Sequence, residues 1–271
     1  MKCKTKYPIM LIHGTGFRDR KFLNYWGRIP AALEKQGATL FYGNQDSWGT
    51  IEHNAEVLRG NLDRILAGAD FEKVNIIAHS KGGLEARYMI SSLGMADRIA
   101  SLTTIATTHH GSRTIDLLCK LPKWLYRAAA FFTDLFFRIL GDKKPDFYTA
   151  SRQFSTGHMK LFNEQNPDEP SVYYQSYAAV MKNPFSDIVL FWPNLFVWII
   201  EGENDGLVTT ESAAWANFKG VLRGATRRGI SHADEVDARR MSFSRKESSD
   251  GISDIRNFYV DVVAGLKQMG L

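Results

Sequence analysis

Short apolar runs alternate along the chain with longer segments in which apolar residues recur every three or four positions. The runs predict buried strands, and the periodic segments predict amphipathic helices. Strands are expected at residues 8–12, 38–42, 73–78, 99–107, 172–180, 195–201 and 221–225. Helices are expected at residues 26–36, 51–65, 82–93 and 252–267. The alternation predicts an α/β fold with a mostly parallel sheet and helices on both of its faces.

This alternation is interrupted between residues 117 and 162. The segment has a helical period, is rich in aromatic residues, as in Phe131-Phe132 and Phe136-Phe137, and carries interspersed Lys and Arg. One interpretation is an ordinary amphipathic helix packed on the core. The other is an inserted helical lid, whose apolar face covers the active site and can meet lipid.

The length and composition predict one folded domain over residues 1–271, with residues 117–162 as its inserted cap. Apolar residues make up 44% of the 271 positions, which is ample for a core, and no repeat or linker divides the chain. The two cysteines, Cys3 and Cys119, lie in segments that do not suggest a disulfide framework.

The formal net charge of +5 adds little about partners. Basic residues are scattered rather than clustered with aromatics on one element, so a nucleic-acid partner is not expected. A solvated surface explains the charge, and a mild attraction to an anionic interface is the alternative.

Two apolar runs could suggest a transmembrane segment or a signal peptide, but neither is long enough for that role. Residues 188–200 are strongly apolar but contain Pro193-Asn194, so no transmembrane segment is expected. The apolar run at residues 7–12 follows a basic start but is too short for a signal peptide and lacks a cleavage site. The expected location is therefore cytoplasmic, or secreted with a signal that this chain does not carry.

A candidate nucleophile follows the apolar run at residues 74–78. The sequence Ala78-His79-Ser80-Lys81-Gly82 ends a predicted strand and begins a predicted helix. This is the arrangement of a nucleophile elbow, in which a sharp turn exposes the serine hydroxyl at the top of a sheet. Small residues two before and two after the serine let strand and helix approach, and Ala78 is small enough for this purpose.

A serine nucleophile needs a base and an acid that orients the base. In the chain order Ser, Asp or Glu, His, only His232 among the seven histidines comes late enough to be the base. Asp205 lies in an Asn-Asp-Gly turn just after the predicted strand 195–201, so it is the expected acid. Glu201 and Glu203 are the alternatives.

The oxyanion of the reaction needs two backbone N–H donors. The residue after the nucleophile, Lys81, is expected to supply one. Thr15, in the glycine-flanked sequence His13-Gly14-Thr15-Gly16 after the first predicted strand, is expected to supply the other. Adjacent side chains diverge on a sharp turn, so a Ser80–Lys81 dyad is not favoured.

These motifs resemble those of bacterial triacylglycerol lipases and carboxylesterases of the α/β-hydrolase fold. The matching segments span about 230 residues in the family's order, at residues 8–14, 74–83, 107–112, 204–208 and 232–237. Ala78 replaces the usual first glycine of the elbow, and Thr108 stands where proline is usual. The resemblance implies hydrolysis of lipid-like esters through an acyl-enzyme.

Other activities are compatible with the same residues. A lysophospholipase, a polyester-cleaving esterase and an acyltransferase would all use this triad. An inactive hydrolase-fold protein that binds lipid is the alternative from a different functional class.

The resemblance also implies a structural calcium, while no cofactor is expected for catalysis. In many of these lipases an aspartate two residues after the catalytic histidine helps to hold the ion, and Asp234 has that position. Asp187 resembles the second ligand. Carboxylate and carbonyl oxygens suit calcium, although both aspartates could equally be surface or helix-capping residues.

Overall fold

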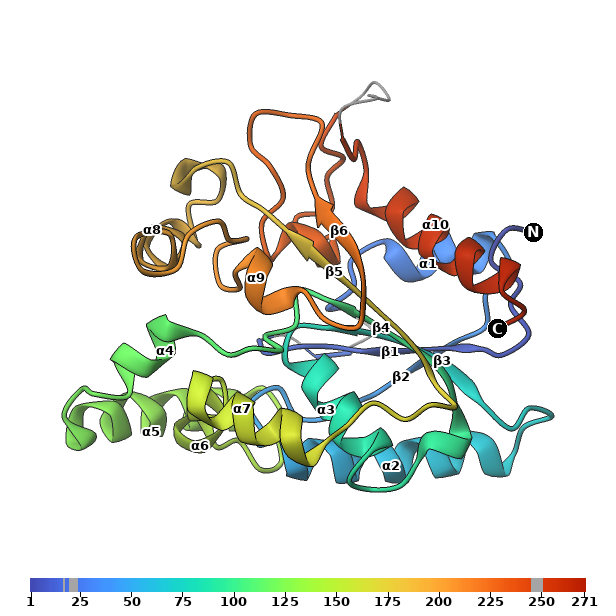
Figure 1. Cartoon of the computed structure of the whole chain (residues 1–271), viewed down its shortest axis with the longest axis horizontal. Coiled ribbons are helices and arrows are strands. Elements are labelled where there is room, and N and C mark those ends of the chain that lie inside the picture. The colour runs from blue at the N-terminus through green and yellow to red at the C-terminus, as the bar shows by residue number, and fades with distance from the viewer. Residues whose placement is uncertain (17, 20–23, 245–250) are drawn as a thin grey trace.

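A computed structural model describes residues 1–16, 18–19, 24–244 and 251–271 of the chain (Figure 1). Its centre is a six-stranded sheet in which all neighbouring strands are parallel, in the order β2-β1-β3-β4-β5-β6. The strands are β1 (Ile9–Ile12), β2 (Leu40–Tyr42), β3 (Val74–His79), β4 (Ile99–Ile105), β5 (Tyr173–Ala179) and β6 (Asn217–Leu222). The predicted α/β class and parallel sheet are confirmed.

Helices cover both faces of the sheet (Figure 1). On one face lie α1 (Ile29–Lys35) and α10 (Ile255–Gln268), and on the other lie α2 (Ile51–Ala67) and α3 (Lys81–Ile90). Alternation along β1 explains the two cores, because successive strand side chains point to opposite faces. Ile9 and Leu11 pack with the α1/α10 side, whereas Met10 and Ile12 pack with the α2/α3 side.

The prediction of a strand at residues 195–201 is wrong. Residues 195–200 belong to a helix, α8 (Phe191–Ile200), in an excursion between β5 and β6, and Glu201 follows the helix. The run is apolar on every side, so its period could not distinguish a buried strand from a helix. Only Asn194 and Val197 of α8 are buried, while Phe196, Trp198 and Ile199 are exposed.

Several other predicted boundaries shift by a few residues, including those of β6 and α1. The strand expected at residues 221–225 is β6, which starts earlier at Asn217 and ends at Leu222. The helix expected at residues 26–36 begins only at Ile29, where Pro30 occupies the first turn and suits a helix start.

Residues 117–162, hereafter the cap segment, are helical as expected. They hold the end of α4 (Arg113–Leu118), α5 (Lys123–Ile139), α6 (Phe147–Arg152) and most of α7 (Thr156–Gln165). Only Tyr126 and Ala130 of α5 are buried, so most of its apolar side chains are exposed. In Figure 1, α4, α5 and α8 lie at one end of the molecule and the two chain ends lie at the other.

The remaining described elements are short. They are α9 (Thr210–Ala213) and the 3-10 turns η1 (Ala96–Arg98), η2 (Pro184–Ser186) and η3 (Asp234–Val236). Within the described residues, no helix combines the length and the apolar character needed to cross a bilayer.

Candidate active site

Ser80 stands at a sharp turn between β3 and α3. Its backbone angles, φ 54° and ψ −129°, lie in a region that non-glycine residues rarely adopt, as expected for a nucleophile elbow. Gly82 shows why the turn needs small residues, since a Cβ there would lie 2.5 Å from the carbonyl oxygen of His13. The elbow therefore brings the start of α3 directly against the end of β1.

The loop after β1 touches the nucleophile. A Cβ on Gly14 would lie 2.7 Å from the Cβ of Ser80, so only glycine fits at this approach. The next residue, Thr15, is half-buried, and its N–H donates no hydrogen bond within the part of the chain that the structure describes. Lys81 is the first residue of α3, so its N–H lacks an acceptor inside the helix. Both N–H groups expected to hold an oxyanion are thus close to the elbow.

The side chain of Lys81 serves a different purpose from its backbone. It is buried, donates from Nζ to the carbonyl oxygen of Gly49 at 2.8 Å, and forms an ion pair with Glu85. Glu85 also accepts from Gln45 at 3.0 Å and from Asn54 at 2.7 Å. This cluster ties the elbow helix to the loop before α2.

His232 and Asp205 form a buried pair. His232 Nδ1 and Asp205 Oδ2 are 2.8 Å apart, and the His232 backbone N–H donates to the Asp205 carbonyl at 2.8 Å. The other carboxylate oxygen accepts from the N–H groups of Leu207 at 2.9 Å and Val208 at 2.8 Å. A proton on Nδ1 leaves Nε2 free to act as a base.

The histidine ring lies beside the elbow. Its centroid is 4.4 Å from that of His79, the residue before Ser80. The Ser80 hydroxyl makes no hydrogen bond to any described residue. Such contacts are often loose in a free enzyme and tighten when substrate binds. The structure therefore brings Ser80, Asp205 and His232 to one end of the sheet, although Asp205 follows α8 rather than a strand.

Glu235 is a site residue that the sequence reasoning missed. It is buried, with Oε2 at 2.7 Å from His79 Nε2 and 3.8 Å from His232 Nδ1. The Tyr25 hydroxyl lies 2.7 Å from the other nitrogen of His79. Burial and the nearby Asp205 raise the pKa of Glu235 well above its usual value, while burial and His232 lower the pKa of His79. The sequence offered one hint, because Glu235 follows His232 by three residues.

His79, His232 and Glu235 are close enough together to raise the question of a metal. Both imidazole nitrogens of His79, and Nδ1 of His232, are already used in hydrogen bonds. The arrangement fits a hydrogen-bonded network behind the base better than a set of free ligands.

The alternative acids lie elsewhere. Glu201 accepts from the Ser112 hydroxyl at 2.6 Å and the Thr114 N–H at 2.8 Å, which fixes the start of α4. Glu203 is exposed and pairs with Arg223 at 3.3 Å.

The two expected calcium ligands do lie together, but around a guanidinium. Asp187 accepts from Arg239 and from the Ser231 hydroxyl, the latter at 2.8 Å. Arg239 Nε also lies 3.6 Å from Asp234. Calcium takes six to eight oxygen ligands. Because a fixed positive charge already engages both carboxylates, this donor set does not fit the ion.

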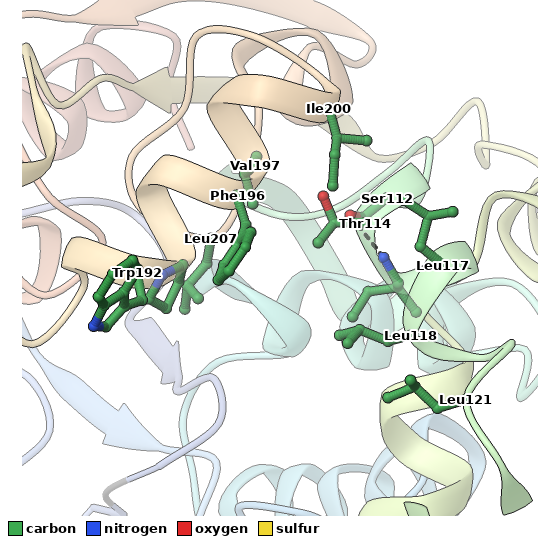
Figure 2. Close-up of a pocket in the computed structure, with 12 residues that line it drawn as sticks. Ser112, Thr114, Leu117, Leu118, Leu121, Trp192, Phe196, Val197, Ile200 and Leu207 are labelled. Carbon is green, nitrogen blue, oxygen red and sulfur yellow. Dashed lines mark hydrogen bonds between the residues drawn. The ribbon is translucent and has the colours of Figure 1, made fainter.

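An apolar cavity of about 620 Å³ lies between α4 and α8 (Figure 2). Leu117 and Leu118 line one side, and Trp192 and Phe196 line the other. Leu207, two residues after Asp205, also borders it. The cavity thus reaches the loop that carries the expected acid.

Comparisons with known proteins agree with the fold. The family model for the alpha/beta hydrolase fold matches residues 7–196. Triacylglycerol lipase 2 of Saccharomyces cerevisiae is 29% identical over 278 residues, covering 93% of this chain and 77% of that protein. The triacylglycerol lipase of Vibrio cholerae is 35% identical over 116 residues, covering 42% of this chain and 36% of that protein.

Solved structures share the fold. The mature lipase of Bacillus licheniformis has a TM-score of 0.65 at 22% identity, with 88% of each chain covered. The Staphylococcus hyicus lipase has a TM-score of 0.68 at 15% identity, covering 99% of this chain and 98% of that one. The chain belongs to the α/β-hydrolase fold family, in which lipases are among the proteins most like it.

Proposed function

We propose that the protein is a serine hydrolase of carboxylic esters with apolar acyl chains. The observation that carries this proposal is the buried Asp205–His232 pair, whose imidazole lies 4.4 Å, between ring centroids, from that of His79, the residue preceding Ser80. The similarity to triacylglycerol lipases supports an ester as the substrate.

The proposed reaction uses three side chains and two backbone N–H groups. Ser80 Oγ attacks the ester carbonyl while His232 Nε2 takes its proton, and Asp205 stabilises the resulting imidazolium. The N–H groups of Thr15 and Lys81 hold the oxyanion. His232 then returns the proton to the departing alcohol, which leaves an acyl group on Ser80. Water, activated by the same imidazole, releases the acid.

We propose that the cavity between α4 and α8 takes the acyl chain. Eight of its twelve lining residues are leucine, isoleucine, phenylalanine or tryptophan, and its volume suits a chain of many carbons. A panel of triacylglycerols, lysophospholipids and aliphatic polyesters would rank the possible substrate classes.

Filling that cavity is expected to change chain-length preference. Leu118→Trp places a larger side chain in it, so kcat/KM for a dodecanoyl p-nitrophenyl ester is expected to fall about tenfold or more, while the acetyl ester is little affected. Leu125→Trp is the matched control, because Leu125 is similarly exposed (44% against 41%) but does not line the cavity. Equal losses on both esters would contradict an acyl-chain role.

We further propose that the cap segment, with its neighbour α8, meets a lipid surface. On α5, Trp124 and Phe132 are 72% and 68% exposed, and Trp192 and Ile199 of α8 are also exposed. Residues 120–144 carry six basic and two acidic side chains. Large apolar side chains bordered by Lys and Arg are typical of surfaces that bind at a lipid interface.

Removing these apolar groups is expected to weaken adsorption. Trp124→Ala combined with Phe132→Ala should lower binding to a triolein emulsion by about a hundredfold or more, because each side chain loses burial worth roughly 1.5–3 kcal/mol. Hydrolysis of soluble p-nitrophenyl acetate should remain. Met269→Ala, an exposed apolar change beyond α10, is the control. Unchanged adsorption of the double variant would rule out this face as the contact.

A further inference from the structure

The loop that carries His232 is fastened by a buried cluster of charged and polar groups. Ser231 and Asp234 flank His232 in sequence, while Asp187 comes from the excursion before α8. The Ser231 hydroxyl donates to Asp187 at 2.8 Å, and the Ser231 N–H donates to Asp234 at 3.2 Å. Asp187 and Asp234 are both largely buried, so their charges need a partner inside the cluster.

Arg239 supplies that partner. Its guanidinium donates to Asp187, lies 3.6 Å from Asp234 at Nε, and contacts the Ser231 hydroxyl at 3.3 Å and the Ser186 carbonyl oxygen at 3.5 Å. One cation therefore faces two carboxylates, a hydroxyl and a carbonyl, all of them oxygen ligands.

The pKa values of Asp187 and Asp234 shift in opposite directions, as expected if Arg239 bonds to Asp187 more closely than to Asp234. Burial opposes ionisation of Asp187, but hydrogen bonds from Ser231 and Arg239 lower its pKa below the usual value. Burial and the neighbouring Asp187 raise the pKa of Asp234 to about 6, although hydrogen bonds from Ser231 oppose the change. Asp187 thus holds the stronger contact with the guanidinium.

A second arginine stands at the edge of the cluster. Arg228 donates to the Ser186 carbonyl oxygen from Nε at 3.0 Å. It contacts the carbonyl rather than the carboxylates, so it does not replace Arg239 between Asp187 and Asp234.

We propose that Arg239 is an internal replacement for a structural calcium ion and that it positions the His232 loop. The guanidinium donates a hydrogen bond to Asp187, forms an ion pair with Asp234 at 3.6 Å and carries a permanent charge, so the loop needs no added cation. The protein should then keep its stability and activity without calcium. The activity part of this inference rests on the proposed role of His232, whereas the stability part does not.

Removal of the arginine should destabilise the loop and open a site for a cation. Arg239→Ala leaves two buried carboxylates facing each other with no cation, which is strongly unfavourable. The vacated space is surrounded by hard oxygen ligands of the kind calcium binds. The variant should therefore lose stability and acquire a response to calcium that the wild-type protein lacks.

Thermal unfolding with and without calcium tests this inference. The wild-type Tm should be the same in EDTA and in millimolar calcium chloride. Arg239→Ala should unfold about 5 °C or more lower in EDTA and should regain part of that loss in calcium chloride. Adding Asp187→Asn should abolish the calcium response, and Arg239→Lys should keep an intermediate Tm without calcium. Arg223→Ala, which removes an exposed arginine paired with Glu203, is the control. Its Tm should equal that of the wild type and should not change with calcium.

Two results would overturn the inference. One is a wild-type protein that EDTA destabilises or that calcium stabilises. The other is an Arg239→Ala protein whose Tm equals that of the wild type or is indifferent to calcium. If Arg239→Ala does not fold, Arg239→Lys and the wild-type chelation series still decide the question. All these measurements follow thermal unfolding and do not depend on activity. If the proposed ester hydrolysis is wrong, the Tm values should still respond to calcium as expected here, while the wild-type protein shows no esterase activity.

Discussion

Ser80→Ala is expected to abolish ester hydrolysis, with kcat falling about a millionfold, as when a nucleophilic serine is removed from a triad. Ser80 stands at the turn with φ 54°, and the nearby Thr107 hydroxyl is already engaged, because it donates to the Ser80 carbonyl oxygen at 2.8 Å. The Ser80 hydroxyl makes no hydrogen bond within the described residues, so its loss should not disturb packing.

The measurement is kcat/KM on a soluble p-nitrophenyl ester, with Tm measured on the same preparations. Ser91→Ala is a matched control because Ser91 ends the same helix, α3, away from the turn. The expected result is an inactive Ser80→Ala protein with a normal Tm beside an active Ser91→Ala protein. Substantial hydrolysis by folded Ser80→Ala would remove the nucleophile from the proposal, and with it the acyl-enzyme.

Asp205→Asn is expected to lower kcat by about 10⁴-fold while the fold is kept. The amide oxygen can still accept from the N–H groups of Leu207 and Val208, so the loop should keep its shape. What disappears is the negative charge 2.8 Å from His232 Nδ1, which fixes the tautomer and stabilises the imidazolium.

Two other carboxyl groups define the controls for that prediction. Glu203 is exposed and paired with Arg223, so Glu203→Gln should retain activity. Glu235 lies 3.8 Å from the same nitrogen, but it is buried and its Oε2 is already bonded to His79 Nε2 at 2.7 Å, so it should not replace the lost carboxylate. Activity near the wild-type level in Asp205→Asn would contradict the assignment of the acid.

The elements of the sheet could be predicted because strand and helix signals coincide there. The run Val74–His79 is wholly buried and ends at a small-residue turn, so length and turn chemistry favour the same interpretation. The helix at residues 191–200 could not be predicted, because a run that is apolar on all sides has no period to read.

The candidate site shows a similar division. Chain order and turn motifs led to Ser80, Asp205 and His232, and the structure places the last two in contact. Glu235 and Arg239 were missed because their positions depend on how separate loops pack. Arg239 reads as an ordinary surface arginine in sequence, and only the folded chain brings Asp187, 52 residues away, to its guanidinium. The role of each site residue stays a prediction until the variants are measured.

The site of reaction with a fluorophosphonate is the most direct test of whether Ser80 is the nucleophile of ester hydrolysis. These reagents phosphonylate an activated serine, and mass spectrometry of proteolytic peptides identifies the residue modified. We expect one adduct, on the peptide that contains Ser80, formed in parallel with loss of ester hydrolysis and absent from Ser80→Ala. Hydrolysis that continues after Ser80 is fully modified, or inactivation that tracks a different residue, would contradict the claim.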